Sequence, residues 1–160
     1  MDIILIAVGK MKEAYLIDGL NDYIDRIKHY ANVELIEVDS EKTKHKINDS
    51  QIERIKNEEG KIIPEKIPEG KNYIISLDRK GKPVTSEGLA KSINNLQVRG
   101  ESRITFVIGG SHGLSDEILE KSDYKMSLSY LTFTHQMSRL ILLEQIYRAF
   151  KILNNEPYHK

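Results

Sequence analysis

The chain has 160 residues, of which 24 are basic and 24 acidic, so its formal net charge is zero. Its length and its 39% apolar content predict a single globular domain over 1–160. The absence of cysteine excludes disulfide scaffolds, thiol catalysis and cysteine-based metal sites, and no apolar run approaches the roughly 20 residues that a membrane-spanning helix needs.

The first half of the chain alternates strand-like and helix-like segments. A β-branched apolar run ends at Gly9, which is typical of a strand buried on both faces. The pattern predicts, in order, a strand over 3–8, a helix over 12–30, a strand over 33–38 and a polar loop over 39–47. A helix capped by Asp49 or Ser50 follows, and Pro64 and Pro68 with Gly70 close that region.

The second half continues the alternation. It predicts, in order, a strand over 73–77, a turn over 78–83, a helix from Thr85 or Ser86 to 96, a strand over 104–108, a helix capped by Ser115, a strand over 125–130 and a helix over 135–153. Such alternation indicates an α/β domain with a mostly parallel sheet and helices on both faces. The last helix carries a wide apolar face, which fits either an oligomer interface or burial in the core.

The charge balance and the N-terminus bear on partners and location. There is no basic tail, so the chain lacks the electrostatic signature of a non-specific nucleic-acid binder. An enzyme that recognises an RNA by its shape remains compatible with this balance. No basic segment precedes the first apolar run, so we expect no signal peptide. Together with the lack of cysteine, this favours a cytoplasmic protein without a membrane partner.

A glycine-rich loop, Gly109–Gly113, directly follows a predicted strand and precedes a helix. Ligands of open α/β sheets bind at the carboxyl ends of strands, where glycine lets the backbone approach closely. The loop is therefore either a ligand loop or a tight turn that needs glycine for its own conformation. It contains neither a dinucleotide-binding fingerprint nor a phosphate-loop lysine.

The same loop matches the G-x-S-x-G pattern of a serine hydrolase, with Ser111 as the nucleophile. Asp116 or Asp123, followed by His135 or His159, would complete the order of such a triad. The chain is short for this class and lacks an upstream oxyanion segment, so the hydrolase is the less favoured alternative.

Polar groups also gather between the predicted strand over 125–130 and the last helix. Residues 128–133 offer hydroxyl and amide groups to a ligand, although they would equally serve as the start of a capped helix. His135 and Arg139 share a helix face at i, i+4, and Glu144 can pair with Arg148 at the same spacing. Either pair could be an ordinary surface contact.

The C-terminal tail offers three polar side chains, Tyr158, His159 and Lys160. It is either part of a site or a frayed terminus. The five histidines show no ligand spacing, so we expect no metal site. Histidine is the side chain best suited to general-base work near neutral pH, which makes His159 and His135 the candidates for that role.

Five motifs in order give the chain a specific resemblance. They are 107–114, 128–133, 135–139, 144–149 and 157–160. Together they resemble the ribosomal RNA large subunit methyltransferase H (RlmH) family. The resemblance implies a SPOUT-type α/β fold with a C-terminal trefoil knot, a homodimer whose active sites use both chains, and S-adenosyl-L-methionine as cofactor. It also implies methylation of N3 of a pseudouridine in the helix 69 stem-loop of 23S rRNA, on assembled 70S ribosomes.

The resemblance assigns roles to particular residues. Cofactor contacts fall on Leu77, Gly109, Leu128, Ser129, Tyr130, Leu131, Thr132 and Phe133. We expect the catalytic set to be His159, Tyr158, Arg148 and His135, and RNA phosphate to lie on Arg139 and Lys160. Thr134 stands where the family commonly has proline. A ribosome-binding protein of the same fold without catalysis is a further alternative.

Overall fold

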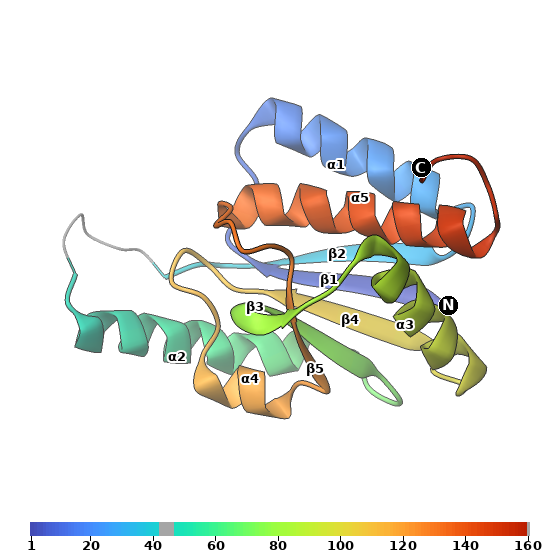
Figure 1. Ribbon diagram of the computed structural model, residues 1–160. Helices are drawn as coiled ribbons and strands as arrows, with labels where there is room; N and C mark the ends of the chain where they lie inside the picture. Colours follow the sequence, from blue (N-terminus) through green and yellow to red (C-terminus); the bar gives the residue numbers. More distant parts are fainter. Residues whose placement is uncertain (42–46, 160) are drawn as a thin grey trace.

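The computed structural model describes residues 1–41 and 47–159, which form five strands and five helices (Figure 1). The strands are β1 (Asp2–Val8), β2 (Asn32–Val38), β3 (Tyr73–Pro83), β4 (Arg103–Ile108) and β5 (Tyr124–Ser127). The helices are α1 (Ala14–Ile27), α2 (Asp49–Lys66), α3 (Ser86–Val98), α4 (Asp116–Lys121) and α5 (His135–Leu153). The part of the predicted loop at 42–46, and Lys160, lie outside the described residues.

All strand pairs are parallel, and the sheet order is β2-β1-β4-β3-β5. The central strands β1 and β4 are buried almost throughout, as expected for parallel strands covered on both faces. The predicted α/β class, the mostly parallel sheet and the helices on both faces are confirmed.

Alternate side chains of β1 pack into two separate hydrophobic cores, one on each face of the sheet. Ile3, Leu5 and Ala7 pack on the face that α1, α3 and α5 cover. Ile4, Ile6 and Val8 pack on the opposite face with side chains from α2 and α4. Figure 1 shows these helix groups on the two sides of the sheet. No helix in the described ranges is long and apolar enough to cross a membrane.

The helix α2 corrects the start predicted for it. Asn48, rather than Asp49 or Ser50, is the N-cap, and it forms a reciprocal capping box with Gln51. The helix contains Pro64 and ends at Lys66, so it closes within the region predicted from Pro64 and Pro68. It stops where Ile67 becomes extended directly before Pro68, a position that disfavours helical backbone.

The third and fifth strands also differ from prediction. The expected turn at 78–83 belongs to β3, because Leu77 and Lys82 both pair with Met126 and the four residues between them protrude. The predicted strand over 125–130 ends at Ser127. Beyond it the apolar alternation is not part of the sheet, and Tyr130 is 93% exposed.

Candidate functional site

A pocket of about 300 Å³ lies at the carboxyl ends of β3 and β5. Its walls come from 84–89, at the start of α3, and from 126–133, which leads from β5 to α5. Ile141 and Gln145 of α5 complete it. The lining is mostly apolar with a few hydroxyl and amide groups, the character of a small-molecule site. Carboxyl ends of parallel strands are where α/β sheets bind ligands.

The structure brings three of the expected cofactor residues to this pocket: Leu128, Ser129 and Phe133. The side chains of Tyr130 and Leu131 face solvent, at 93% and 72% exposure. Thr132 is exposed as well. Tyr130, Leu131 and Thr132 could therefore face a molecule in the pocket only through their backbone groups.

The other two expected contacts, Leu77 and Gly109, do not line the pocket. Leu77 pairs with Met126, whose side chain lines the pocket. Gly109 is buried in the loop after β4, and a Cβ there would lie 2.5 Å from the carbonyl carbon of Gly113. The amide of Gly113 donates to the carbonyl of Gly110 at 3.1 Å. The loop thus needs glycine for its own tight turn, whether or not a ligand also touches it.

The candidate hydrolase triad is not assembled. Ser111 is exposed, and within the described ranges no hydrogen bond joins it to a histidine or an aspartate. Asp123 accepts the amide of Ile74 at 2.7 Å. His135 lies near Gly9, and His159 lies beside Arg148. The geometry therefore gives no support to a serine hydrolase.

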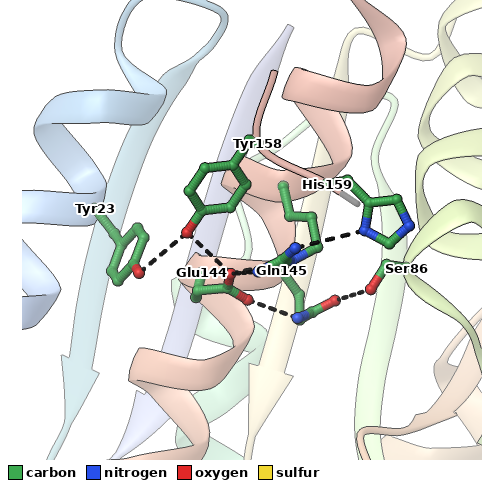
Figure 2. A network of polar contacts seen from close by, with 7 residues as sticks. Tyr23, Ser86, Glu144, Gln145, Tyr158 and His159 are labelled. Atoms are coloured by element: carbon green, nitrogen blue, oxygen red, sulfur yellow. Dashed lines mark hydrogen bonds and ion pairs between the residues drawn. The ribbon is translucent and has the colours of Figure 1, made fainter. Parts of the chain in front are cut away.

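A polar network borders the pocket and includes the tail (Figure 2). Glu144 is its common acceptor: Oε1 accepts from Arg148 Nη2 at 2.5 Å and from the Tyr158 hydroxyl at 3.1 Å. Its Oε2 accepts from Gln145 Nε2 at 2.6 Å, and Gln145 Oε1 accepts from the Ser86 hydroxyl at 2.6 Å. The predicted Glu144–Arg148 pair is confirmed. The network connects the tail to two pocket-lining residues.

His159 is held between two opposite charges. Its Nε2 lies 2.7 Å from Glu87 Oε1, and its Nδ1 lies 3.4 Å from Arg148 Nη1. A carboxylate only accepts and a guanidinium only donates, so these partners favour the neutral tautomer with hydrogen on Nε2. Nδ1 is then the acceptor for Arg148, and it can take a proton only after Arg148 releases it.

Tyr158 is docked on its own chain rather than frayed. Its ring packs edge-on against Tyr147, with centroids 4.9 Å apart, and Arg148 lies over its face at 4.7 Å. Its hydroxyl lies 3.4 Å from the Tyr23 hydroxyl. Burial, followed by hydrogen bonds to Tyr23 and Glu144, raises the pKa of Tyr158. The phenol therefore remains protonated at neutral pH and acts as a hydrogen-bond donor.

Arg139 does not lie on the surface, where it would have to be to contact RNA phosphate. Its side chain is fully buried, and it donates to Glu37 Oε1 at 2.9 Å and to the carbonyls of Val8 and Gly9 at 2.7 Å each. This corrects the assignment of Arg139 to RNA phosphate, because no phosphate can reach a guanidinium enclosed in this way. The residue joins α5 to β1 and β2 instead.

His135 lies apart from the tail network. It sits near Gly9 and Arg139, where burial, followed by the charges of Arg139 and Lys12, lowers its pKa. It begins α5, and Arg148 lies thirteen residues further along that helix, a rise of about 20 Å. His135 and His159 of one chain therefore do not act on the same atom.

Several members of the site escaped the sequence analysis. Gln145, Ser86, Glu87 and Tyr23 all belong to the network, and none was singled out for a site role. Gln145 is next to Glu144 in a mostly apolar stretch, and nothing local indicates that Ser86 lies opposite it. Among the described residues no cluster of histidine and carboxylate side chains could hold a metal ion.

Comparison with known proteins places this geometry in context. A family model described as a predicted SPOUT methyltransferase matches residues 1–159. A ribosomal RNA large subunit methyltransferase H of Halothermothrix orenii is 54% identical over the full length of both chains, and one of Clostridioides difficile is 50% identical, also over both full lengths. A probable methylase family protein of Haemophilus influenzae has a similar fold, with a TM-score of 0.54 at 15% identity over 99% of this chain and 70% of that one.

Proposed function

The chain belongs to the SPOUT methyltransferases and within them to the RlmH family, and from this premise we propose that it methylates N3 of a pseudouridine in helix 69 of 23S rRNA, in assembled 70S ribosomes. It is a ribosomal RNA large subunit methyltransferase that uses S-adenosyl-L-methionine. The observation that carries the proposal is full-length identity of about half to such enzymes, combined with a pocket at the carboxyl ends of β3 and β5.

The chemistry of the pocket lining suits the cofactor. Apolar side chains such as Leu89 and Phe133 offer surfaces for a flat base, and Ser129 and Gln145 offer polar groups. We propose that residues 128–133, with Leu77 and Gly109, hold the cofactor, the exposed members through their backbone. We further propose that 128–133 belongs to a trefoil knot. The proposal rests on the family, and in the structure this segment lines the same pocket as residues 84–89.

When bound, the cofactor supplies an electrophilic methyl group. The chain's own groups must align the acceptor nitrogen, remove its proton and stabilise the charge left on the base. We assign proton removal to His159 Nδ1, with Glu87 at Nε2 stabilising the imidazolium that forms. We assign stabilisation of the anionic base to the Tyr158 hydroxyl and the Arg148 guanidinium. In the structure these groups donate to Glu144 and His159, so each exchanges that acceptor for the base. Alignment supplies most of the rate enhancement in such transfers.

The assembly and location belong to the same proposal. We propose a homodimer in which the tail of one protomer serves the pocket of its partner, with each protomer a single domain over 1–160 in the cytoplasm. The neutral net charge supports recognition of a preassembled ribosomal surface over that of a bare stem-loop.

Transfer of labelled methyl groups to 70S ribosomes that lack this modification tests the function. We expect label in 23S rRNA, recovered after digestion as 3-methylpseudouridine, and little transfer to an isolated helix 69 stem-loop. Ribosome binding without transfer would favour the non-catalytic alternative. Label in a different nucleoside would overturn the assignment of the target.

A further inference from the structure

A basic protrusion interrupts the edge of the sheet next to the pocket. Leu77 and Lys82 both pair with Met126, so the four residues between them leave the ladder and return to it. Where the chain rejoins the sheet, its backbone packs closely against β5: a Cβ on Gly81 would lie 2.8 Å from the backbone carbonyl of Lys125. The protrusion is therefore pressed against β5, the last strand of the sheet, and is not a free loop.

Positive charge is concentrated there. Arg79, Lys80 and Lys82 are exposed, as is Lys125 on the paired strand. Within the described ranges none of these four side chains forms an ion pair with a carboxylate. We refer to these four side chains as the basic edge.

Two nearby acids accept backbone amides and, in the part of the chain that the structure describes, form no ion pair with the basic edge. Asp78 accepts the amide of Lys80 at 3.2 Å, and Asp123 accepts the amide of Ile74 at 2.7 Å. The chain as a whole has no net charge, but this part of its surface carries four cations without ion-pair partners among the described residues. Such a surface favours an anionic partner.

The basic edge is continuous with the pocket. Met126, the partner of Lys82, lines the pocket, and so does Val84, which is two residues from Lys82 and so at most about 7 Å away along the chain. A target base that reaches the pocket brings its flanking phosphates to this rim. Phosphate contacts by lysine and arginine fix the register of a nucleic acid without reading its sequence.

We infer that the basic edge binds the phosphate backbone of the RNA that carries the target base. This inference rests on the proposed function, since the pocket is the reference point for the RNA. It also replaces the phosphate contact that the buried Arg139 does not supply.

The test is a triple variant, Arg79→Gln, Lys80→Gln and Lys82→Gln, which removes three exposed charges and leaves the backbone pairing in place. The matched control is Arg54→Gln, Lys61→Gln and Lys66→Gln, exposed residues of α2 on the opposite face of the sheet. Co-sedimentation with 70S ribosomes and the rate of methyl transfer are both measured over a range of salt concentrations. Cofactor affinity is measured separately by calorimetry.

We expect the triple variant to bind ribosomes at least about tenfold more weakly, with a logarithmic salt slope smaller by about 2, as the loss of three phosphate contacts predicts. Its cofactor affinity and kcat stay unchanged, and the α2 control behaves as the unsubstituted chain. Equal weakening in both variants, or in neither, overturns the inference, as does failure of the unsubstituted chain to sediment with ribosomes. Ribosome binding without methyl transfer contradicts the proposed function, while the binding comparison still decides the role of the basic edge.

Discussion

His159 has a defined environment at the scale of single residues, which makes its role testable. Replacing it with alanine removes the group assigned to proton removal, and we expect single-turnover methyl transfer on ribosomes to slow by about 10²–10⁴-fold. Cofactor affinity stays unchanged, because His159 does not line the pocket. The control is His112→Ala, in the glycine loop. Full single-turnover rate in the His159 variant would exclude the residue as the base.

Glu59 is a buried carboxylate, 5% exposed, that lies against the glycine loop. Burial raises its pKa, although the amide of Glu41 donates to it at 3.2 Å. A raised pKa means that folding favours the protonated form, so stability falls as pH rises from the ordinary glutamate pKa through the folded one.

We therefore expect Glu59→Gln to raise the free energy of unfolding at pH 7 by about 1 kcal/mol, or Tm by about 2–4 °C. The gain disappears in acid, below the ordinary glutamate pKa, where both side chains are neutral. Thermal unfolding followed across pH measures the gain in stability at pH 7 and its disappearance in acid. Glu58→Gln is the control, because a hydrogen bond from Lys61 lowers the pKa of that carboxyl and no gain is expected. Equal stability of the Glu59 variant and the parent at pH 7 would contradict the argument.

Arg139 shows what sequence reasoning misses at this scale. Its spacing from His135 indicates a shared helix face, but not what that face meets. The acceptors are Glu37 and the carbonyls of Val8, at the end of β1, and of Gly9 directly after it, all more than a hundred residues away in the chain. Only the fold determines that an arginine in this helix is enclosed rather than exposed.

At the scale of elements, Thr134 supplies the cap of α5. Its hydroxyl accepts the amide of Met137 at 3.2 Å, and its φ is −63°. That φ is also the value proline imposes, which explains how threonine and proline can occupy the same position.

We expect Thr134→Ala to cost about 1 kcal/mol of stability through loss of the cap. Thr134→Pro also loses the side-chain cap, but its fixed φ restricts the unfolded chain, so the net change is smaller. Thermal unfolding and methyl transfer measured on both variants check this. Loss of cofactor binding in the proline variant alone would show that the threonine has a role beyond the cap.

Element types were predictable where periodicity was strong, and boundaries failed where pairing decides them. The buried strand at the N-terminus and the long final helix follow directly from their apolar patterns. The stretch 78–83 reads as a turn because of its charges and glycine, yet its end pairs with β5. Conversely, residues 128–130 continue the alternation of β5 but have no strand to pair with. Local sequence carries no information about either partner.

At the scale of the whole molecule, the order of the strands in the sheet brings the parts of the site together. The pocket joins residues about forty positions apart, from 84–89 and 126–133, because β3 and β5 are neighbours at one end of the sheet. The family resemblance located the second segment and the tail. It did not indicate that Gln145 and Ser86 connect them, since that contact depends on how α5 crosses α3.

The C-terminal tail could act on the pocket of its own chain or on that of the partner in the proposed homodimer. In one protomer His159 contacts Glu87, the neighbour of the pocket-lining Ser86, so the tail lies close to a pocket of its own chain. The proposed homodimer requires that the same tail serve the partner's pocket. Co-expressing two complementary defective chains separates these arrangements. One carries Leu128→Glu, which places a charge in the pocket wall, and the other carries Tyr158→Ala and His159→Ala.

Each defective chain alone should be inactive, the first with loss of cofactor binding and the second without it. If the tail acts on the partner, a heterodimer contains one site with an intact pocket and an intact tail. Half of the dimers are mixed at equal expression, so we expect about a quarter of the parental transfer to ribosomes. If the tail serves its own chain, every site lacks one of its two parts, and no activity returns although purified heterodimers are present. The second result would contradict the shared active site while leaving the methyltransferase assignment intact, because that assignment rests on the pocket and on the family.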